Sequence, residues 1–280
     1  MATKKDAAPA AEKNELITVD PNRFAVGDVV DYGDSAGAGV DDIGMDETGV
    51  PFVKILQDDC KELKGGVVPE DALGNLFDTG TQEFSSELLL VPVCRQHVYN
   101  EWVPRKKGGG MVGTYSPDDQ VVKAAIAASE EFGKYRTEAG NDLVENYLLF
   151  CIVLDPVTEE PTGFVVVPWS SSAIKVYRKR LMGRIRPVMV NGPSGKRRPP
   201  MFAHRIVLGT EIERKGDDEW FNYTVRFPVE NNPRKSLMTA EHPGFQAGAE
   251  LFDMVQGGSA KADMSTADTA APDDDGGAAF

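Results

Sequence analysis

The sequence has 280 residues, of which 41% are hydrophobic and 26% charged, as in chains that fold around an apolar core. Its formal net charge is −14, so the average electric field of the protein repels nucleic acid and anionic lipid. No run approaches the about 20 apolar residues that a membrane-spanning helix needs, and the N-terminal residues lack the apolar region of a secretory signal. We therefore expect a cytoplasmic protein with no membrane partner.

Cysteine and histidine are sparse and dispersed. The three cysteines, Cys60, Cys94 and Cys151, are odd in number and far apart, which predicts reduced thiols rather than disulfides. The three histidines form no close cluster with each other or with cysteine. We therefore expect no metal site and no cofactor.

Charge is distributed unevenly along the chain. Residues 1–48 carry −7 and residues 253–280 carry −5, whereas residues 171–235 carry +9. One strongly basic segment in an acidic protein predicts a polyanionic partner for that segment, with the acidic end as a competitor or an interaction arm.

The first half of the chain is predicted to contain strands after a flexible arm. Residues 1–48 are rich in Ala, Asp and Gly without a sustained apolar period, which predicts an acidic arm without fixed structure. The first strand is expected at residues 50–56. A continuous apolar run at 87–93 predicts a buried strand, and residues 97–103 alternate as a second strand does, before a Gly-rich turn at 108–110.

The middle of the chain is predicted to combine a helix with a β-hairpin. Ser116 suits the N-cap and Pro117 the first turn of a helix, with an apolar stripe through residues 122–132. Segments rich in β-branched and aromatic residues then predict two paired strands, at 147–154 and 163–168, around a turn-rich linker.

The last part of the chain begins with a basic helix, predicted at residues 173–185 and followed by a flexible basic loop at 191–200. Two strands are expected next, at 201–215 and 219–228. Residues 236–255 predict a last helix, and beyond Gly257 the composition is typical of a disordered tail.

These elements favour a β-rich α+β fold, because the strands arrive mainly as hairpins with helices inserted between them. An OB-like Greek-key barrel with inserted helices is the preferred architecture, and a β-sandwich is the alternative. The domain prediction is a flexible arm at 1–48, a single OB-like nucleic-acid-binding domain at 49–256 and a disordered acidic tail at 257–280.

Clustered Lys and Arg give the strongest functional signal, since cations neutralise phosphates and release counterions without regard to sequence. The alternative is a solvated surface whose cations pair with the abundant acids elsewhere. The predicted phosphate-binding residues are Lys175, Arg178, Lys179, Arg180, Arg184, Arg186, Lys196, Arg197 and Arg198, with Arg105, Lys106 and Lys107 as a further contribution.

Aromatic residues with basic neighbours give the second signal. An aromatic ring that stacks on an unpaired base contributes about 1–3 kcal/mol with little regard to sequence. The alternative is that most of these rings belong to the core. The predicted stacking residues are Tyr99, Trp102, Tyr177, Phe202 and Trp220.

The C-terminus gives the third signal, with Asp273, Asp274 and Asp275 followed by small residues and a terminal Phe280. Carboxylates can imitate phosphates and a phenyl ring can imitate a base. We predict that this tail competes for the basic segment or docks on partner proteins, against the alternative of a solubilising tail.

No catalytic residues are predicted. The sequence contains no Gly-x-Ser-x-Gly elbow, no P-loop and no dinucleotide fingerprint. Acidic pairs such as Asp58-Asp59 and Glu159-Glu160 lie in predicted turns without evident partners for a metal.

An OB-like domain, a basic segment with aromatic residues and an acidic tail that ends in Phe280 together resemble tailed-phage single-stranded DNA-binding proteins. The stretches Tyr99–Gly110 and Pro168–Lys175 also look like those of phage proteins given that role. The resemblance implies a non-enzymatic protein that protects and organises single-stranded DNA in replication or recombination. It also implies that the tail recruits a polymerase, a helicase or a recombinase.

Three other functions stay open from the sequence. The protein is alternatively a phage virion or assembly protein, a metal-dependent DNA-processing enzyme, or a binder of double-stranded DNA or RNA. A homo-oligomer is compatible with each of them.

Overall fold

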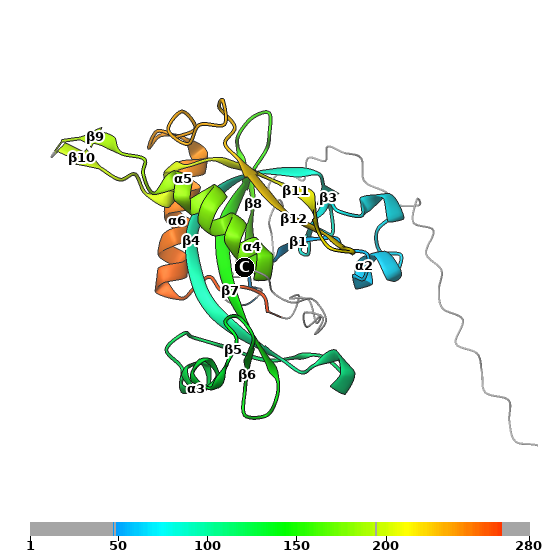
Figure 1. The fold of residues 1–280 in the computed structure, drawn as a ribbon. Coiled ribbons are helices and arrows are strands. Elements are labelled where there is room, and N and C mark those ends of the chain that lie inside the picture. The colour runs from blue at the N-terminus through cyan, green and yellow to red at the C-terminus, as the bar shows by residue number, and fades with distance from the viewer. Residues whose placement is uncertain (1–46, 48, 194, 265–280) are drawn as a thin grey trace, which may run out of the picture. The chain divides into compact units, whose positions relative to one another are not determined.

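Two long antiparallel strands, β4 (Glu87–Trp102) and β7 (Asp142–Leu154), form the centre of the fold (Figure 1). The structure, a computed structural model, describes residues 47, 49–193 and 195–264, and all of them belong to one compact unit of the chain. The order across the main seven-stranded sheet is β12-β11-β4-β7-β6, with β5 also paired to β4 and β8 to β7. The remaining strands of this sheet are β5 (Met111–Tyr115), β6 (Tyr135–Arg136), β8 (Pro161–Ser170), β11 (Ile206–Lys215) and β12 (Asp218–Arg226).

The two ends of β4 have different neighbours along the same edge. Strand β11 pairs with Glu87–Leu90, whereas β5 pairs with the opposite end, from Tyr99 to Trp102. Because a strand rises about 3.4 Å per residue, these two ends are separated by roughly 40 Å of chain. Features attached to β11 and to β5 are therefore far from each other along the strand.

A β-bulge changes the alternation of β4. Pro92 pairs with Cys151, but the next pair is Cys94 with Phe150, so Val93 is an extra residue. Val93 and Cys94 consequently lie on the same side of the sheet, in one hydrophobic cluster. Every later residue of β4 faces opposite to where simple alternation from Glu87 would place it.

Helices cover both faces of the sheet. On one face lies a continuous helical run of α4 (Ser171–Val176), the π-helical segment η4 (Tyr177–Met182) and α5 (Gly183–Ile185). It packs against strand residues that include Leu149, Val167 and Trp169. On the other face α6 (Pro243–Gly257) packs through Leu251 and Val255.

A smaller three-stranded sheet contains β1 (Val53–Ile55), β2 (Leu76–Asp78) and β3 (Phe84–Ser85). Hydrogen bonds connect it to the main sheet, among them those from the Val166 N–H to the Pro51 carbonyl and from the Tyr223 hydroxyl to the Val53 carbonyl. Two short helices follow its first strand, α2 (Lys61–Lys64) and η2 (Glu70–Ala72).

The β-rich class predicted from the sequence is confirmed, but the sheets do not close into a barrel among the residues described. Both faces of the main sheet are already covered by helices, so it buries its apolar residues without curling into a closed barrel. A sandwich of two facing sheets is not formed for the same reason.

Most predicted strands are confirmed, and the β7–β8 hairpin is among them. The segments 87–93 and 97–103, predicted as two strands, are one strand. Strand β11 begins at Ile206 rather than 201, because a 3-10 turn, η5 (Met201–Ala203), follows Pro200. The predicted loop at 191–200 contains a hairpin of β9 (Val190–Gly192) and β10 (Gly195–Arg197).

Two predicted helices begin later than expected. Helix α3 (Gln120–Ala128) starts after Asp119 rather than Ser116, because the Asp119 carboxylate accepts a hydrogen bond from the Ser116 backbone and closes a turn there. Helix α6 starts at Pro243 rather than 236, because His242 accepts a hydrogen bond from the Gly244 N–H and caps it.

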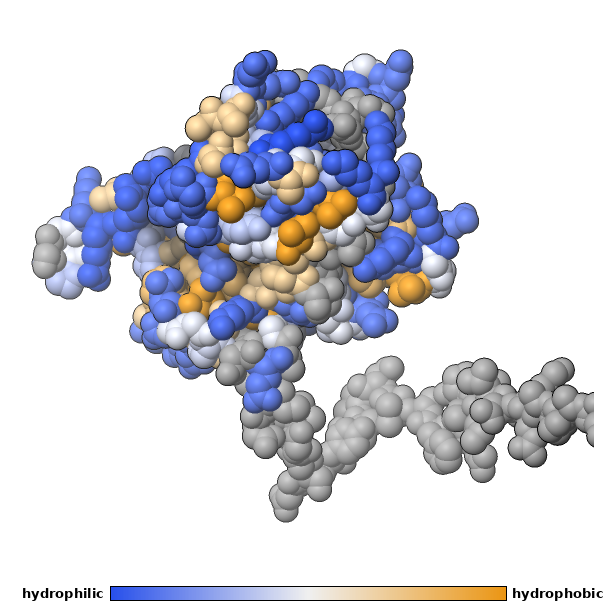
Figure 2. Space-filling view, turned by 90° about the horizontal axis from the view of Figure 1, so that it is seen from below, coloured by the Kyte–Doolittle hydropathy of each residue, from blue (hydrophilic) through white to orange (hydrophobic). Residues whose placement is uncertain are grey.

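The predicted apolar stripe of α3 is only half buried. Val122 and Ala125 are in the core, but Ile126 is 39% exposed and Phe132, beyond the helix, is 63% exposed. Val112 and Val121 are exposed in the same part of the chain. Figure 2, which views the molecule from below Figure 1, shows apolar side chains gathered on this face among hydrophilic ones.

Candidate nucleic-acid interface

The strongest concentration of positive charge lies on the helical run α4–η4–α5 and the β9–β10 hairpin. Residues 171–200 contain nine Lys and Arg and no Asp or Glu. We call these nine side chains the basic surface; they are Lys175, Arg178, Lys179, Arg180, Arg184, Arg186, Lys196, Arg197 and Arg198.

Apolar residues hold this helical run on the sheet and so direct the cations outward. Ile174, Tyr177, Leu181 and Ile185 follow one another at three- and four-residue spacing and are all buried. Leu181 is 0% exposed, and burying a leucine of this kind stabilises the fold by about 1.5–3 kcal/mol. The opposite face of the helix is therefore left to Lys175, Lys179 and their neighbours.

Only two of the nine cations pair with a carboxylate among the described residues. Arg178 lies 3.4 Å from Glu145, and Arg180 lies 2.6 Å from Glu211. Arg184 donates instead to Asn231 and lies over the Phe227 ring. These contacts fix the side chains but, apart from the two ion pairs, leave their charges uncompensated.

Five cations of the basic surface are exposed and make no ion pair with any described residue. They are Lys175, Lys179, Arg186, Lys196 and Arg197. Arg198 donates to the Arg186 backbone carbonyl, a neutral partner that leaves its charge uncompensated as well. The expectation that acids elsewhere neutralise this segment therefore applies to a minority of its members.

The β9–β10 hairpin carries Lys196 and Arg197 away from the sheet, and Figures 1 and 2 both show it at the left. Gly192 leaves room there for the Arg197 side chain, since a Cβ at that position would lie 2.6 Å from the Arg197 Nε and the side chain would have to move. The Arg197 side chain therefore passes close to the Gly192 backbone.

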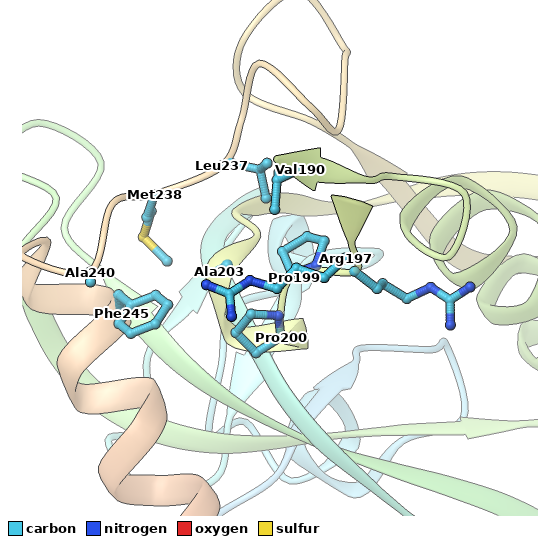
Figure 3. A pocket seen from close by; sticks show the side chains of 10 residues that line it. Val190, Arg197, Pro199, Pro200, Ala203, Leu237, Met238, Ala240 and Phe245 are labelled. Carbon is cyan, nitrogen blue, oxygen red and sulfur yellow. The ribbon is translucent and has the colours of Figure 1, made fainter. Parts of the chain in front are cut away.

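A hollow of about 500 Å³ lies where the hairpin joins the fold. Figure 3 shows Phe245 and Met238 on one side of it and Pro199 and Pro200 on the other. Arg197 and Arg198 are part of its lining. The hollow is thus lined mainly by apolar side chains, with two arginines contributing to its lining.

The second basic cluster predicted from the sequence is not part of this surface. Arg105–Lys107 forms the short helix η3, beyond the end of β4 where β5 pairs. The hairpin leads instead into β11, which pairs with the other end of β4. Gly108, Gly109 and Gly110 all have positive φ, a conformation that favours glycine and makes this loop intolerant of other residues.

Three of the five predicted stacking residues have little free ring surface. Tyr99 is 6% exposed and packs near Tyr135, while Tyr177 is 2% exposed between Trp169 and Tyr147. Phe202 is partly buried against Phe245. The rings next to the basic surface therefore belong to the core and do not offer a face to a base.

The other two predicted stacking residues, Trp102 and Trp220, lie together in a different place, although Trp102 is as buried as Tyr99, at 6% exposed. Both line a cleft of about 330 Å³ between the end of β8, the start of α4 and strand β12. The cleft also contains Asn146 and Ser171, which the sequence interpretation missed. Asn146 directly precedes the apolar run 147–154, and a lone amide at the edge of such a run was the available signal.

The sequence profile of one family, described as Pam3 phage gp34-like protein, matches residues 18–261. The chain belongs to this family. Phage origin, which the resemblance implied, is therefore supported, and the Pam3 phage gp34-like match spans both the basic surface and the cleft. No curated protein and no solved structure matches the chain.

Two of the three cysteines of this Pam3 phage gp34-like chain, Cys94 and Cys151, are buried. Burial raises the pKa of Cys94 to about 11 and that of Cys151 well above its usual value. Both thiols are therefore protonated at neutral pH, and a protonated thiol is a poor nucleophile and a poor metal ligand. Among the described residues no group of His, Cys, Asp and Glu could hold a metal ion.

None of the described helices has the length and apolar character needed to cross a bilayer. The predicted docking tail, with Asp273, Asp274, Asp275 and Phe280, lies outside the described residues.

Proposed function

We propose that this phage protein binds nucleic acid, single-stranded DNA in the first place, through the basic surface and without catalysing a reaction. The observation that carries the proposal is the group of seven cations, out of nine, that no described carboxylate neutralises. Such groups attract phosphates because each contact releases a counterion. The surface selects for charge and not for base identity, since the neighbouring rings are buried.

The proposed biological role is to protect and organise single-stranded DNA during phage replication or recombination. The acidic tail would then regulate access to the basic surface and recruit a polymerase, a helicase or a recombinase. The resemblance to tailed-phage single-stranded DNA-binding proteins supports this role, and so does the phage family to which the chain belongs.

The test is fluorescence anisotropy of a labelled poly-dT oligonucleotide and of a duplex, over a range of salt concentrations. The variant replaces Lys179, Arg186 and Lys196 by Ala. At about 1 kcal/mol per lost contact, its affinity should fall roughly 100-fold. The slope of log K against log salt should fall by about 2, because each single-strand phosphate contact contributes about 0.7.

The matched control replaces three exposed lysines outside the basic surface, Lys61, Lys64 and Lys261, by Ala. It changes the net charge equally and should retain nearly full affinity. If both variants lose affinity equally, the effect is due to overall charge and not to the basic surface. If the natural chain does not bind poly-dT at low salt, the proposal is refuted.

A virion or assembly role is the second candidate, and one observation favours it. Val112, Ile126 and Phe132 are exposed near the β5 and α3 end of the molecule, where contact with another copy would bury them. Light scattering without DNA separates the two candidates. Regular oligomers that dissociate on Phe132→Asp substitution, together with absent DNA binding, would favour assembly.

A further inference from the structure

The cleft that contains Trp102 and Trp220 is assembled from distant parts of the chain. Asn100 and Trp102 come from β4, Asn146 from β7, Ser171 from the start of α4, and Trp220 and Asn222 from β12. Its volume of about 330 Å³ is at the small end of the range for small-molecule sites.

Asn146 provides a hydrogen-bond acceptor that nothing described satisfies. The residue is 8% exposed, and its Oδ1 atom is buried with no partner among the described residues. Leaving a buried amide carbonyl unpaired costs about 1–3 kcal/mol. A leucine would fill this position without that cost, so an asparagine here indicates a ligand that donates a hydrogen bond.

Trp220 provides the complementary donor. Its Nε1 is also buried without a partner among the described residues. Two residues that line the cleft therefore carry an unsatisfied acceptor and an unsatisfied donor, and the lining also includes the aromatic residues Trp102 and Phe221.

The cleft carries almost no net charge. Lys54 lines it, but its Nζ lies 2.9 Å from the Glu62 Oε1, and both side chains are buried. Asn222 is likewise engaged, since its Nδ2 donates to the Ser172 hydroxyl at 3.2 Å. An ionic ligand would lose its hydration here without a counter-charge, so the geometry favours a neutral ligand with polar edges.

We propose that this cleft binds a single nucleobase, as part of a DNA strand or as a free nucleoside. A base is neutral and flat, and its edge carries both N–H donors and carbonyl or ring-nitrogen acceptors, which match Asn146 and Trp220. Ser171 has a φ of +48°, a backbone conformation that costs energy outside glycine and often marks binding sites.

The arrangement connects the cleft with the basic surface. Lys175 lies four residues after Ser171 in the same helix, which places the two on one helical face about one turn apart. A strand whose base enters the cleft would thus bring its phosphates to the first cation of the basic surface. For a base within a strand the inference rests on the proposed function, whereas for a free nucleoside it stands alone.

The experiment uses the full chain and isothermal titration calorimetry with the four deoxynucleosides, poly-dT and an abasic oligonucleotide of equal length. The variants are Asn146→Leu, which removes the acceptor at similar volume, and Trp220→Phe, which removes the donor but keeps a ring. Each should weaken binding of the preferred nucleoside at least tenfold. Asn146→Leu should also raise the midpoint of thermal unfolding, which shows that the variant is folded.

The basic-surface variant with Lys179, Arg186 and Lys196 replaced by Ala is the matched control, and it should bind nucleosides within twofold of the natural chain. Poly-dT should bind more tightly than the abasic strand, and Asn146→Leu should abolish that difference. If the protein binds nucleosides but not the DNA strand, the proposed function is refuted, whereas the proposal that the cleft binds a nucleobase stands. If poly-dT and the abasic strand bind equally and no nucleoside binds, the proposal that the cleft binds a nucleobase is overturned, whereas the proposed function stands.

Discussion

The basic surface and the cleft differ in almost every physical property. The first consists of exposed cations from one continuous segment, 171–200, and the second of neutral, largely buried groups from β4, β7, α4 and β12. Salt screens exposed charges but hardly affects buried hydrogen bonds. The comparison teaches that affinity for a polyanion and selectivity for its bases can occupy separate parts of one molecule and can be varied independently.

The largest expected effect concerns the stability of the fold, at a buried histidine that follows the segment bearing the basic surface. His204 follows η5 and is 0% exposed, and burial lowers its pKa to about 4. An unfolded histidine has a pKa of about 6.5, so the unfolded state binds the proton first as pH falls. The free energy of unfolding should therefore decrease by about 3 kcal/mol between pH 6.5 and 4.

Urea unfolding at several pH values between 7 and 4 measures this effect. A His204→Leu variant stays neutral throughout and should show a flatter profile, especially above pH 5, where few carboxylates are protonated. The same decrease in the variant and the natural chain would show that other groups cause the acid sensitivity.

The second effect acts on the cleft alone. Gly74 has a φ of +80°, and a Cβ there would lie 2.3 Å from the Phe221 ring, which lines the cleft beside Trp220. Gly74→Ala should lower the free energy of unfolding by about 1–3 kcal/mol through overpacking. It should weaken nucleoside binding while leaving the salt slope of strand binding unchanged.

Gly66→Ala is the control, because Gly66 also has a positive φ, +68°, but a Cβ there would meet nothing within 4 Å. The Gly66→Ala variant therefore has only the conformational cost of a positive φ and no steric overlap. If both variants weaken nucleoside binding equally in calorimetry, the contact with Phe221 is irrelevant to the cleft.

The smallest effect is expected from the tail. Deleting Asp273–Phe280 should tighten binding of poly-dT by about three- to tenfold at low salt, because a tethered competitor acts at high effective concentration. The gain should vanish as salt screens the carboxylates. Fluorescence anisotropy measures the affinity for the DNA strand, and calorimetry measures the affinity for the nucleoside.

The outcome of the deletion shows whether the tail competes for the basic surface, for the cleft or for neither. A gain for the strand alone assigns it to the basic surface, and a gain for the nucleoside assigns Phe280 to the cleft. Unchanged affinity for both would refute competition and leave partner recruitment as the role of the tail.

Much of the secondary structure was predictable, because it depends on local periodicity. The alternation in 219–228 predicts that Phe221, Tyr223, Val225 and Phe227 share the core face; the last three are buried, whereas Phe221 is only partly buried. The basic surface was equally visible, since nine cations without an acid need no tertiary structure to be noticed. What local patterns did not show was which of these cations pair with Glu145 and Glu211, residues distant in sequence.

The cleft was not predictable from periodicity. Trp102 and Trp220 were each proposed to stack on bases, but nothing local indicates that β4 and β12 bring them to one cavity. Tyr177 shows the opposite case, because its basic neighbours in the sequence point outward while its own ring lies in the core. Contacts between residues far apart in the sequence decided both outcomes.

The bulge at Val93 has a consequence for how this protein can change during evolution. Because Val93 and Cys94 lie on the same side of the sheet, deleting Val93 would restore simple alternation in β4 while Cys94 stays opposite Phe150. Asn100 and Trp102 would keep their places in the cleft. A deletion between Cys94 and Asn100, where the strand has no extra residue, would instead exchange the faces of the residues on one side of it. Relatives of this protein are therefore expected to differ in length at position 93 more readily than elsewhere in β4.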